Sequence, residues 1–131
     1  MTSIILVSHS EKITDGVKEL IEEMTGSAVR IHSAGGTEDG RLGTSVDKIM
    51  KSLESSRDCK RILLFADIGS AVMNIETALE LVDDEIKEKC VFVDGPIVEG
   101  AFAAAVQSMV SDNLDDILRE VEKMKTSSKI S

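Results

Sequence analysis

The stretch that decides the fold is Ser3-Ile4-Ile5-Leu6-Val7-Ser8, close to the start of the chain. Its apolar residues are continuous and do not alternate with polar ones. This pattern is typical of a strand that is covered on both faces of a sheet. Apolar residues then recur at helical spacing up to Gly26, and we expect them to form the buried face of a helix: Ile13, Val17, Leu20, Ile21 and Met24.

The same alternation of strand and helix continues along the chain. Further strands are predicted at 28–33, 61–66 and 90–93, and further helices at 46–53, 75–82, 97–109 and 114–121. Such alternation predicts an α/β fold, with a mostly parallel, doubly wound sheet and helices on both faces. We expect residues 1–125 to form a single domain and residues 126–131 to form a frayed polar tail.

Composition limits the classes of function. The 131 residues include 15 basic and 24 acidic ones, and the net charge of −9 disfavours binding to nucleic acid. No apolar run approaches the roughly 20 residues that a membrane span needs, and the first residues lack a basic segment typical of a signal peptide. We therefore expect a cytoplasmic protein that does not bind membranes. Cys59 and Cys90 lack metal or redox spacing and are predicted to be structural thiols.

Residues that directly follow the strands are the candidates for chemistry. In parallel sheets, ligands bind beyond the carboxyl ends of the strands. Here these positions are 8–10, 33–44, 67–70 and 94–96. The glycine-rich part of the second segment, residues 35–44, lacks the Gly-Lys-Ser/Thr of a nucleotide-binding loop.

His9 is the first candidate for a catalytic residue. It follows the first strand and precedes a helix, where backbone N–H groups favour anions. A neutral imidazole can act as a nucleophile near pH 7. The alternative is a histidine that only hydrogen-bonds a loop. Ser8 and Glu11 have the spacing of a capping box, which favours a helix start here. His32, within the second predicted strand, is interpreted as structural.

Asp67 is the second candidate, because it ends the third predicted strand. Its carboxylate could accept a hydrogen bond from one ring nitrogen of His9, which would fix the tautomer and leave the other nitrogen free to attack. It could equally cap the helix that follows. We find no cluster of residues with metal-ligand spacing, and predict no metal on this chain.

Five short motifs carry a resemblance to a known family. They span about residues 3–122, and in order they are Val7-Ser8-His9-Ser10, Leu42-Gly43-Thr44-Ser45, Ala66-Asp67-Ile68-Gly69-Ser70-Ala71, Glu76-Thr77-Ala78-Leu79-Glu80-Leu81 and Pro96-Ile97-Val98-Glu99-Gly100. Together they resemble the phosphotransferase subunit of PEP-dependent dihydroxyacetone kinase, whose first domain is similar to the mannose-type EIIA fold. Some members continue into HPr-like and enzyme I-like domains, whereas this sequence resembles the single-domain form.

The resemblance implies a phosphohistidine relay. His9 would accept phosphate from phospho-HPr, and Asp67 would orient its ring. Ser70 corresponds to a phosphate-contacting serine, and N–H groups near Ser10 would also bind phosphate. Gly43 and Thr44 match the family's loop near the site.

The resemblance also implies the partners. The phosphate would pass to ADP bound on the nucleotide-binding subunit of the kinase, which acts with a dihydroxyacetone-binding subunit. Mg²⁺ and ADP would belong to that partner, with no cofactor on this chain. A homodimer is expected as well.

Three alternative functions compete with this interpretation. The EIIA domain of a mannose-class sugar transporter would have the same fold and histidine but another acceptor. A response-regulator receiver would need acidic residues after the first strand, where Ser8 and His9 stand. In a non-catalytic binding module, His9 and Asp67 would be incidental.

Overall fold

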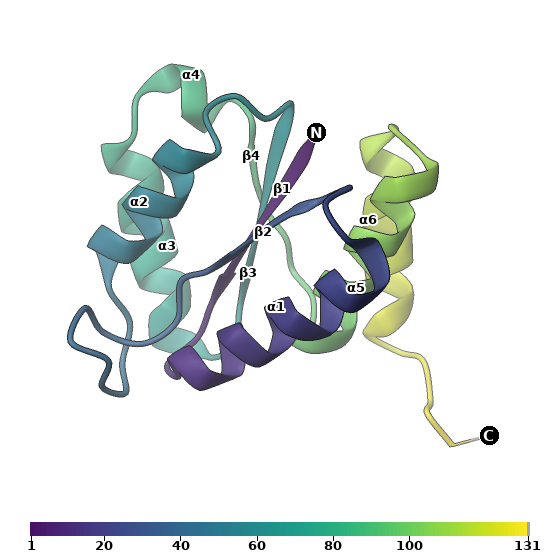
Figure 1. Ribbon diagram of the computed structural model, residues 1–131, viewed down its shortest axis with the longest axis horizontal. Coiled ribbons are helices and arrows are strands. Elements are labelled where there is room, and N and C mark those ends of the chain that lie inside the picture. Colours follow the sequence, from purple (N-terminus) through teal and green to yellow (C-terminus); the bar gives the residue numbers. More distant parts are fainter. Residues whose placement is uncertain (131) are drawn as a thin grey trace.

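The computed structural model describes residues 1–130 and contains one sheet covered by helices (Figure 1). All strand pairs are parallel, and the four strands lie in the order β2-β1-β3-β4. The strands are β1 (Thr2–Val7), β2 (Arg30–Ser33), β3 (Arg61–Ala66) and β4 (Cys90–Phe92), and the helices are α1 (Glu11–Thr25), α2 (Val46–Ser55), α3 (Gly69–Leu81), α4 (Asp84–Lys87), α5 (Ile97–Val110) and α6 (Leu114–Met124). The predicted α/β class and doubly wound sheet are confirmed.

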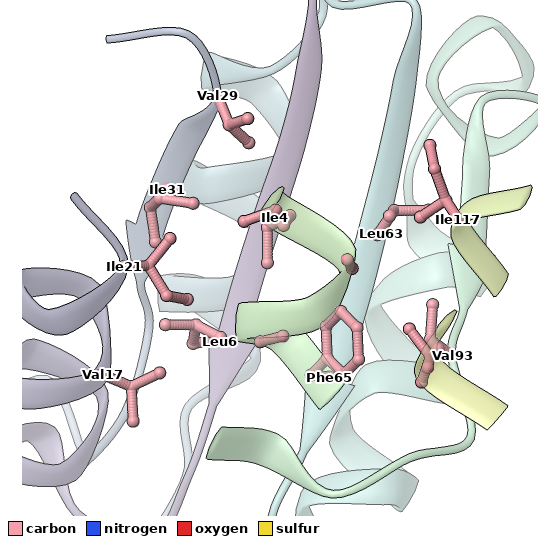
Figure 2. Packing of buried hydrophobic residues seen from close by; sticks show 14 residues of the cluster. Ile4, Leu6, Val17, Ile21, Val29, Ile31, Leu63, Phe65, Val93 and Ile117 are labelled. Carbon is pink, nitrogen blue, oxygen red and sulfur yellow. The ribbon is translucent and has the colours of Figure 1, made fainter. Parts of the chain in front are cut away.

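Both faces of the sheet are buried, which explains the continuous apolar run in β1. Ile4 and Leu6 point to the face covered by α1, α5 and α6, where they pack with Phe65 of β3 (Figure 2). Ile5 and Val7 point to the opposite face, covered by α2, α3 and α4. Figure 1 shows these two groups of helices on opposite sides of the strands. Successive strand residues face opposite sides, so every position of β1 had to be apolar or small.

The strand order places a topological switch point between β1 and β3. From β1 the chain passes through α1 to β2, on one side of β1, and then returns through α2 to β3 on its other side. The loops that leave β1 and β3 therefore diverge to opposite faces of the sheet. A crevice opens between such loops, and ligands of doubly wound folds bind there.

The predicted buried face of α1 is only partly correct. Val17 and Ile21 are buried, but Ile13, Leu20 and Met24 are 46%, 49% and 58% exposed. The helix instead buries Thr14 and Thr25 along with the two apolar residues. Thr14 takes a core position because its hydroxyl accepts a hydrogen bond from the N–H of Gly35, 3.0 Å away, in the loop after β2.

Helix α4 was not predicted from the sequence. Asp83 caps this helix by accepting a hydrogen bond from the N–H of Ile86, whose side chain is fully buried.

The expected polar tail follows α6. Residues 127–130 form no helix or strand, and Lys129 pairs with Glu99. Ser131, the last residue of the expected tail, lies outside the described residues.

Both cysteines are free thiols. Cys59 is buried and Cys90 is half-buried, and burial raises the pKa of the Cys90 thiol to about 11. A thiol with so high a pKa is almost entirely protonated near neutral pH and is a poor nucleophile. This agrees with the predicted structural role.

His32 makes stability depend on pH. It lies in β2, and its Nε2 is buried without a partner among residues 1–130. Burial, with Lys18 and Arg30 nearby, lowers the pKa of His32 below the ordinary 6.5. The unfolded chain binds this proton more readily than the folded one. The contribution of neutral His32 to the free energy of unfolding is therefore fully present above about pH 6.5, and it is lost as the pH falls toward the lower pKa that His32 has in the folded state. Denaturation at a series of pH values should show this decline in the wild type but not in His32→Gln; parallel curves would contradict the expectation.

Candidate active site

The sheet register brings the loops after β1 and β3 together. Val7 lies opposite Ala66 in the parallel pair, so Ser8 and Asp67 leave the sheet side by side. The N–H of Asp67 donates to the carbonyl of Val7, at 3.1 Å, and closes the junction. His9 is the next residue along, and its ring therefore starts beside Asp67 at the switch point.

The carboxylate of Asp67 accepts hydrogen bonds on both oxygens. Oδ2 accepts from the Ser8 hydroxyl at 2.8 Å and from the N–H of His9 at 2.9 Å. Oδ1 accepts from the N–H of Ile68 at 2.7 Å and lies 3.1 Å from Nδ1 of His9. Burial opposes ionisation of Asp67, but the hydrogen bonds from these groups outweigh it and hold the pKa of the carboxyl below its usual value. Asp67 is thus an anion near neutral pH.

The ionised Asp67 decides where His9 carries its proton. A carboxylate offers only acceptors, so Nδ1 must be the donor in the 3.1 Å contact. In the neutral ring this leaves Nε2 without a proton. Nε2 contacts the hydroxyl of Ser70, which lies in the first turn of α3 and is exposed. In this tautomer the unprotonated nitrogen therefore lies beside the exposed hydroxyl of Ser70, which can donate to it.

Asp67 is not the cap of α3, which corrects one of the two sequence alternatives. The cap residue is Ile68, which provides no side-chain hydrogen bond to the helix. The N-terminal N–H groups of an α-helix lack partners within the helix, and here no capping side chain covers them. Because Ser70 belongs to this turn, these donors lie at the same helix start as the hydroxyl that meets Nε2.

The predicted capping box at Ser8 and Glu11 is wrong. Ser10 caps α1, since its hydroxyl accepts from the N–H of Ile13 at 3.4 Å. Glu11 pairs with Lys48 of α2 at 2.6 Å instead of reaching back to the helix start. The N–H of Ser10 donates to the Ser8 hydroxyl at 3.0 Å. The N–H of Ser10 and one acceptor position of its hydroxyl are thus occupied, and phosphate binding by the N–H groups near Ser10 stays a prediction.

The glycine-rich loop is held against the site by backbone hydrogen bonds. The N–H of Gly43 donates to the carbonyl of His9 at 2.8 Å, and that of Gly36 donates to the carbonyl of Ser8 at 2.9 Å. Gly43 has φ +133°, in a region that favours glycine. The hydroxyl of Thr44 accepts from the side chain of Asn74 in α3. Gly43 and Thr44 thus lie near His9 and tie it to α3.

Gly35 is expected to be intolerant of substitution. A Cβ at this position would lie 2.6 Å from the carbonyl oxygen of Ser10 and 2.4 Å from the hydroxyl of Thr14. Gly35→Ala should therefore lower the free energy of unfolding by about 1–3 kcal/mol, the usual cost of overpacking. Chemical denaturation measures this change. Gly16→Ala is the control, because nothing lies within 4 Å of that position; equal stability of the two variants would contradict the expected clash.

A cavity of about 350 Å³ lies beside Asp67. It opens between the start of α3 and the loop after β4, and Ile68, Val72 and Phe92 form its apolar wall. Asp94, on the opposite rim, pairs with Lys125 at 3.1 Å. The cavity leaves room for a side chain of another molecule next to the site.

Three further observations concern metal ions, membrane spans and the second histidine. Within residues 1–130, no group of three His, Cys, Asp or Glu side chains is arranged to hold a metal ion. None of the helices in that range combines the length and the apolar character that crossing a membrane requires. His32 lies in β2, opposite Ile5, and is not among the residues that contact His9 or Asp67.

Several known proteins are similar to this chain in sequence. Residues 3–118 match the EIIA-man family model, described as PTS system fructose IIA component. The phosphoryl donor subunit DhaM of PEP-dependent dihydroxyacetone kinase 2 from Listeria innocua serovar 6a is 52% identical over 92% of this chain and 97% of that relative. DhaM of PTS-dependent dihydroxyacetone kinase from Lactococcus lactis subsp. lactis is 36% identical, over 92% of this chain and 94% of its own. The chain spans only 26% of the 36% identical DhaM from Escherichia coli K12.

Solved structures share the fold. The crystal structure of EF1359, a protein of unknown function, has a TM-score of 0.86 and 44% identity, and the match covers 92% of each chain. EIIA from Streptococcus agalactiae has a TM-score of 0.66 and covers 95% of this chain and 92% of its own. At 22% identity, the second likeness concerns the fold alone.

Proposed function

Because this chain belongs to the EIIA-man family, we propose that it relays a phosphoryl group through His9, as the phosphoryl donor subunit of a PEP-dependent dihydroxyacetone kinase. The observation that carries this proposal is the chain of contacts from Asp67 through His9 to Ser70. These contacts leave Nε2 of His9 unprotonated at the surface. The Asp67 carboxylate lies on the other side of the ring, and the Ser70 hydroxyl lies beside Nε2 as a donor. Residues 1–125 would act together as one phosphocarrier domain.

The chemistry is an in-line transfer between two histidines. Nε2 of His9 attacks the phosphorus of the donor's phosphohistidine; the new N–P bond forms as the donor's N–P bond breaks, and that electron pair returns to the donor's ring. The transition state is loose, so positioning and donors around the three phosphoryl oxygens matter most. Ser70 and the start of α3 would supply donors, while Asp67 offsets the positive charge of the phosphorylated ring.

The names of the relatives support a dihydroxyacetone kinase as the partner. Those subunits are called phosphoryl donors of dihydroxyacetone kinase. As the family resemblance implies, we propose phospho-HPr as the donor to His9, and ADP on the nucleotide-binding subunit as the acceptor. Mg²⁺ would act with ADP on that subunit, and a dihydroxyacetone-binding subunit would use the product. Transfer between histidines needs no metal on this chain.

A second candidate function is that of an EIIA domain of a mannose-class sugar transporter. It is favoured by the description of the family model, which names a sugar-specific IIA component. The 52% identity to a DhaM subunit, over 92% of this chain and 97% of that relative, favours the kinase. A non-catalytic module would not need an aspartate held by several donors against a surface histidine.

The first experiment tests whether phosphate arrives. The protein is incubated with PEP, enzyme I and HPr and examined by intact-mass analysis, with a matched reaction that lacks HPr. We expect one added phosphoryl group, dependent on HPr and lost in acid, as for phosphohistidine. An unmodified mass in the complete reaction would refute the proposed relay.

We also propose that the chain forms a homodimer. An apolar groove of about 530 Å³ runs between α1, α5 and α6, lined by Leu20, Val98, Phe102 and Met124 among others. A surface of this kind marks a contact site between proteins. Sedimentation should show a dimer at micromolar concentration and a monomer for Leu20→Glu. A monomeric wild type would remove this proposal.

A further inference from the structure

Ser8 lies at the centre of the site, although it cannot touch an incoming phosphoryl group. It directly follows β1 and is fully buried. Its carbonyl receives the N–H of Gly36, and its hydroxyl bridges the start of α1 and Asp67. The contacts that carry the proposed relay run from Asp67 through His9 to Ser70, and the Ser8 hydroxyl bonds the same carboxylate from its buried side.

The hydrogen bonds of this hydroxyl have a fixed direction. The oxygen of Ser8 accepts from the N–H of Ser10 at 3.0 Å, because an amide N–H can only donate. Its single proton then points to the other partner, Oδ2 of Asp67, at 2.8 Å. A carboxylate oxygen that receives this proton and the N–H of His9 is held in place and is best satisfied as an anion.

We propose that Ser8 is a positioning residue: its hydroxyl fixes Asp67 so that the carboxylate keeps the proton of His9 on Nδ1 and leaves Nε2 free to take the phosphoryl group. This inference rests on the proposed relay and deepens it. The N–H groups of His9 and Ile68 hold one oxygen each, and Ser8 adds the side-chain donor to Oδ2 that completes this set and keeps Oδ1 3.1 Å from Nδ1. The same hydrogen bond is among those that lower the pKa of Asp67, which makes Asp67 a weaker base and leaves the proton on the ring.

The chain contains a matched control for the loss of a buried serine hydroxyl. Ser3 lies in β1, the strand that Ser8 directly follows, is also fully buried, and its hydroxyl forms a hydrogen bond with the hydroxyl of Ser56 at 2.7 Å. This contact joins β1 to the end of α2, and Asp67 takes no part in it. Ser3→Ala and Ser8→Ala thus remove comparable packing and hydrogen bonding, and only Ser8→Ala touches the carboxylate.

The test combines a spectroscopic and a kinetic measurement. ¹⁵N spectra of ring-labelled protein give the tautomer of His9 without any phosphate present. The wild type and Ser3→Ala should show one tautomer with the proton on Nδ1, whereas Ser8→Ala should add the Nε2–H form. Transfer from phospho-HPr should slow about tenfold in Ser8→Ala, with an unchanged KM for phospho-HPr, since one charged hydrogen bond is lost behind the nucleophile.

Each result decides the inference. A wild-type tautomer and rate in Ser8→Ala would overturn it, and so would an equal loss of rate in Ser3→Ala. If Ser8→Ala does not fold, Ser8→Cys replaces it, because a thiol fills the site but is a weak donor; a wild-type tautomer there would overturn the inference. If the wild type takes no phosphate, the relay fails, while the tautomer spectra still test the role of Ser8.

Discussion

Replacing His9 with alanine is expected to abolish phosphorylation by phospho-HPr. Nε2 of His9 is the nucleophile of the proposed relay, and the contacting Ser70 hydroxyl cannot replace it. The fold should persist, since the ring is partly exposed and its backbone N–H and carbonyl keep their partners, Asp67 and Gly43. Intact-mass analysis after incubation with PEP, enzyme I and HPr measures the loss.

His32→Gln is the matched control for this experiment. It removes the other imidazole of the chain, which lies in β2 away from these contacts, and phosphorylation should remain complete. Phosphate retained on the His9→Ala protein and mapped to another residue would disprove the site assignment.

Replacing Asp67 with asparagine is expected to slow transfer about 100-fold, which corresponds to about 2.7 kcal/mol in the barrier. The carboxylate accepts on both oxygens, whereas an amide presents an NH₂ group to one set of these donors. It also cannot offset the charge of a phosphorylated ring. Rapid-quench measurement of a single turnover gives the rate.

Asp94→Asn provides the control for a loss of charge near the site. Asp94 is 97% exposed and pairs only with Lys125 among the described ion pairs, so the transfer rate should be unchanged. A wild-type rate in Asp67→Asn would leave Asp67 a structural role alone.

The sequence predicts the sheet but not its strand order. The apolar runs locate all four strands within two residues, because burial on both faces leaves a clear pattern. The order β2-β1-β3-β4 depends on long-range pairing, which local periodicity does not encode. The sequence allowed a contact between His9 and Asp67 to be proposed. The structure explains this contact, because β1 and β3 are neighbouring strands and end side by side.

The errors in the site come from competition for the same polar groups. Ser8 has the spacing of a helix cap, but its hydroxyl donates a hydrogen bond to Asp67, and Ser10 caps α1 instead. The role of Ser8 was missed for this reason; its signal was a polar residue at the end of an apolar strand, directly before His9. A separate error concerns the buried face of α1. Helical spacing predicted a core position for Leu20, but this residue lines the groove between α1, α5 and α6.

In the proposed function, His9 passes its phosphate to ADP on the nucleotide-binding subunit of the kinase. The most direct measurement mixes the phosphorylated protein separately with free ADP, with the ADP-loaded subunit, and with a mannose-type IIB domain, and follows the loss of the phosphoryl group by intact mass. We expect discharge only to the ADP-loaded subunit. Discharge to the IIB domain alone would contradict it in favour of sugar transport, and discharge to free ADP would make this chain a kinase in its own right.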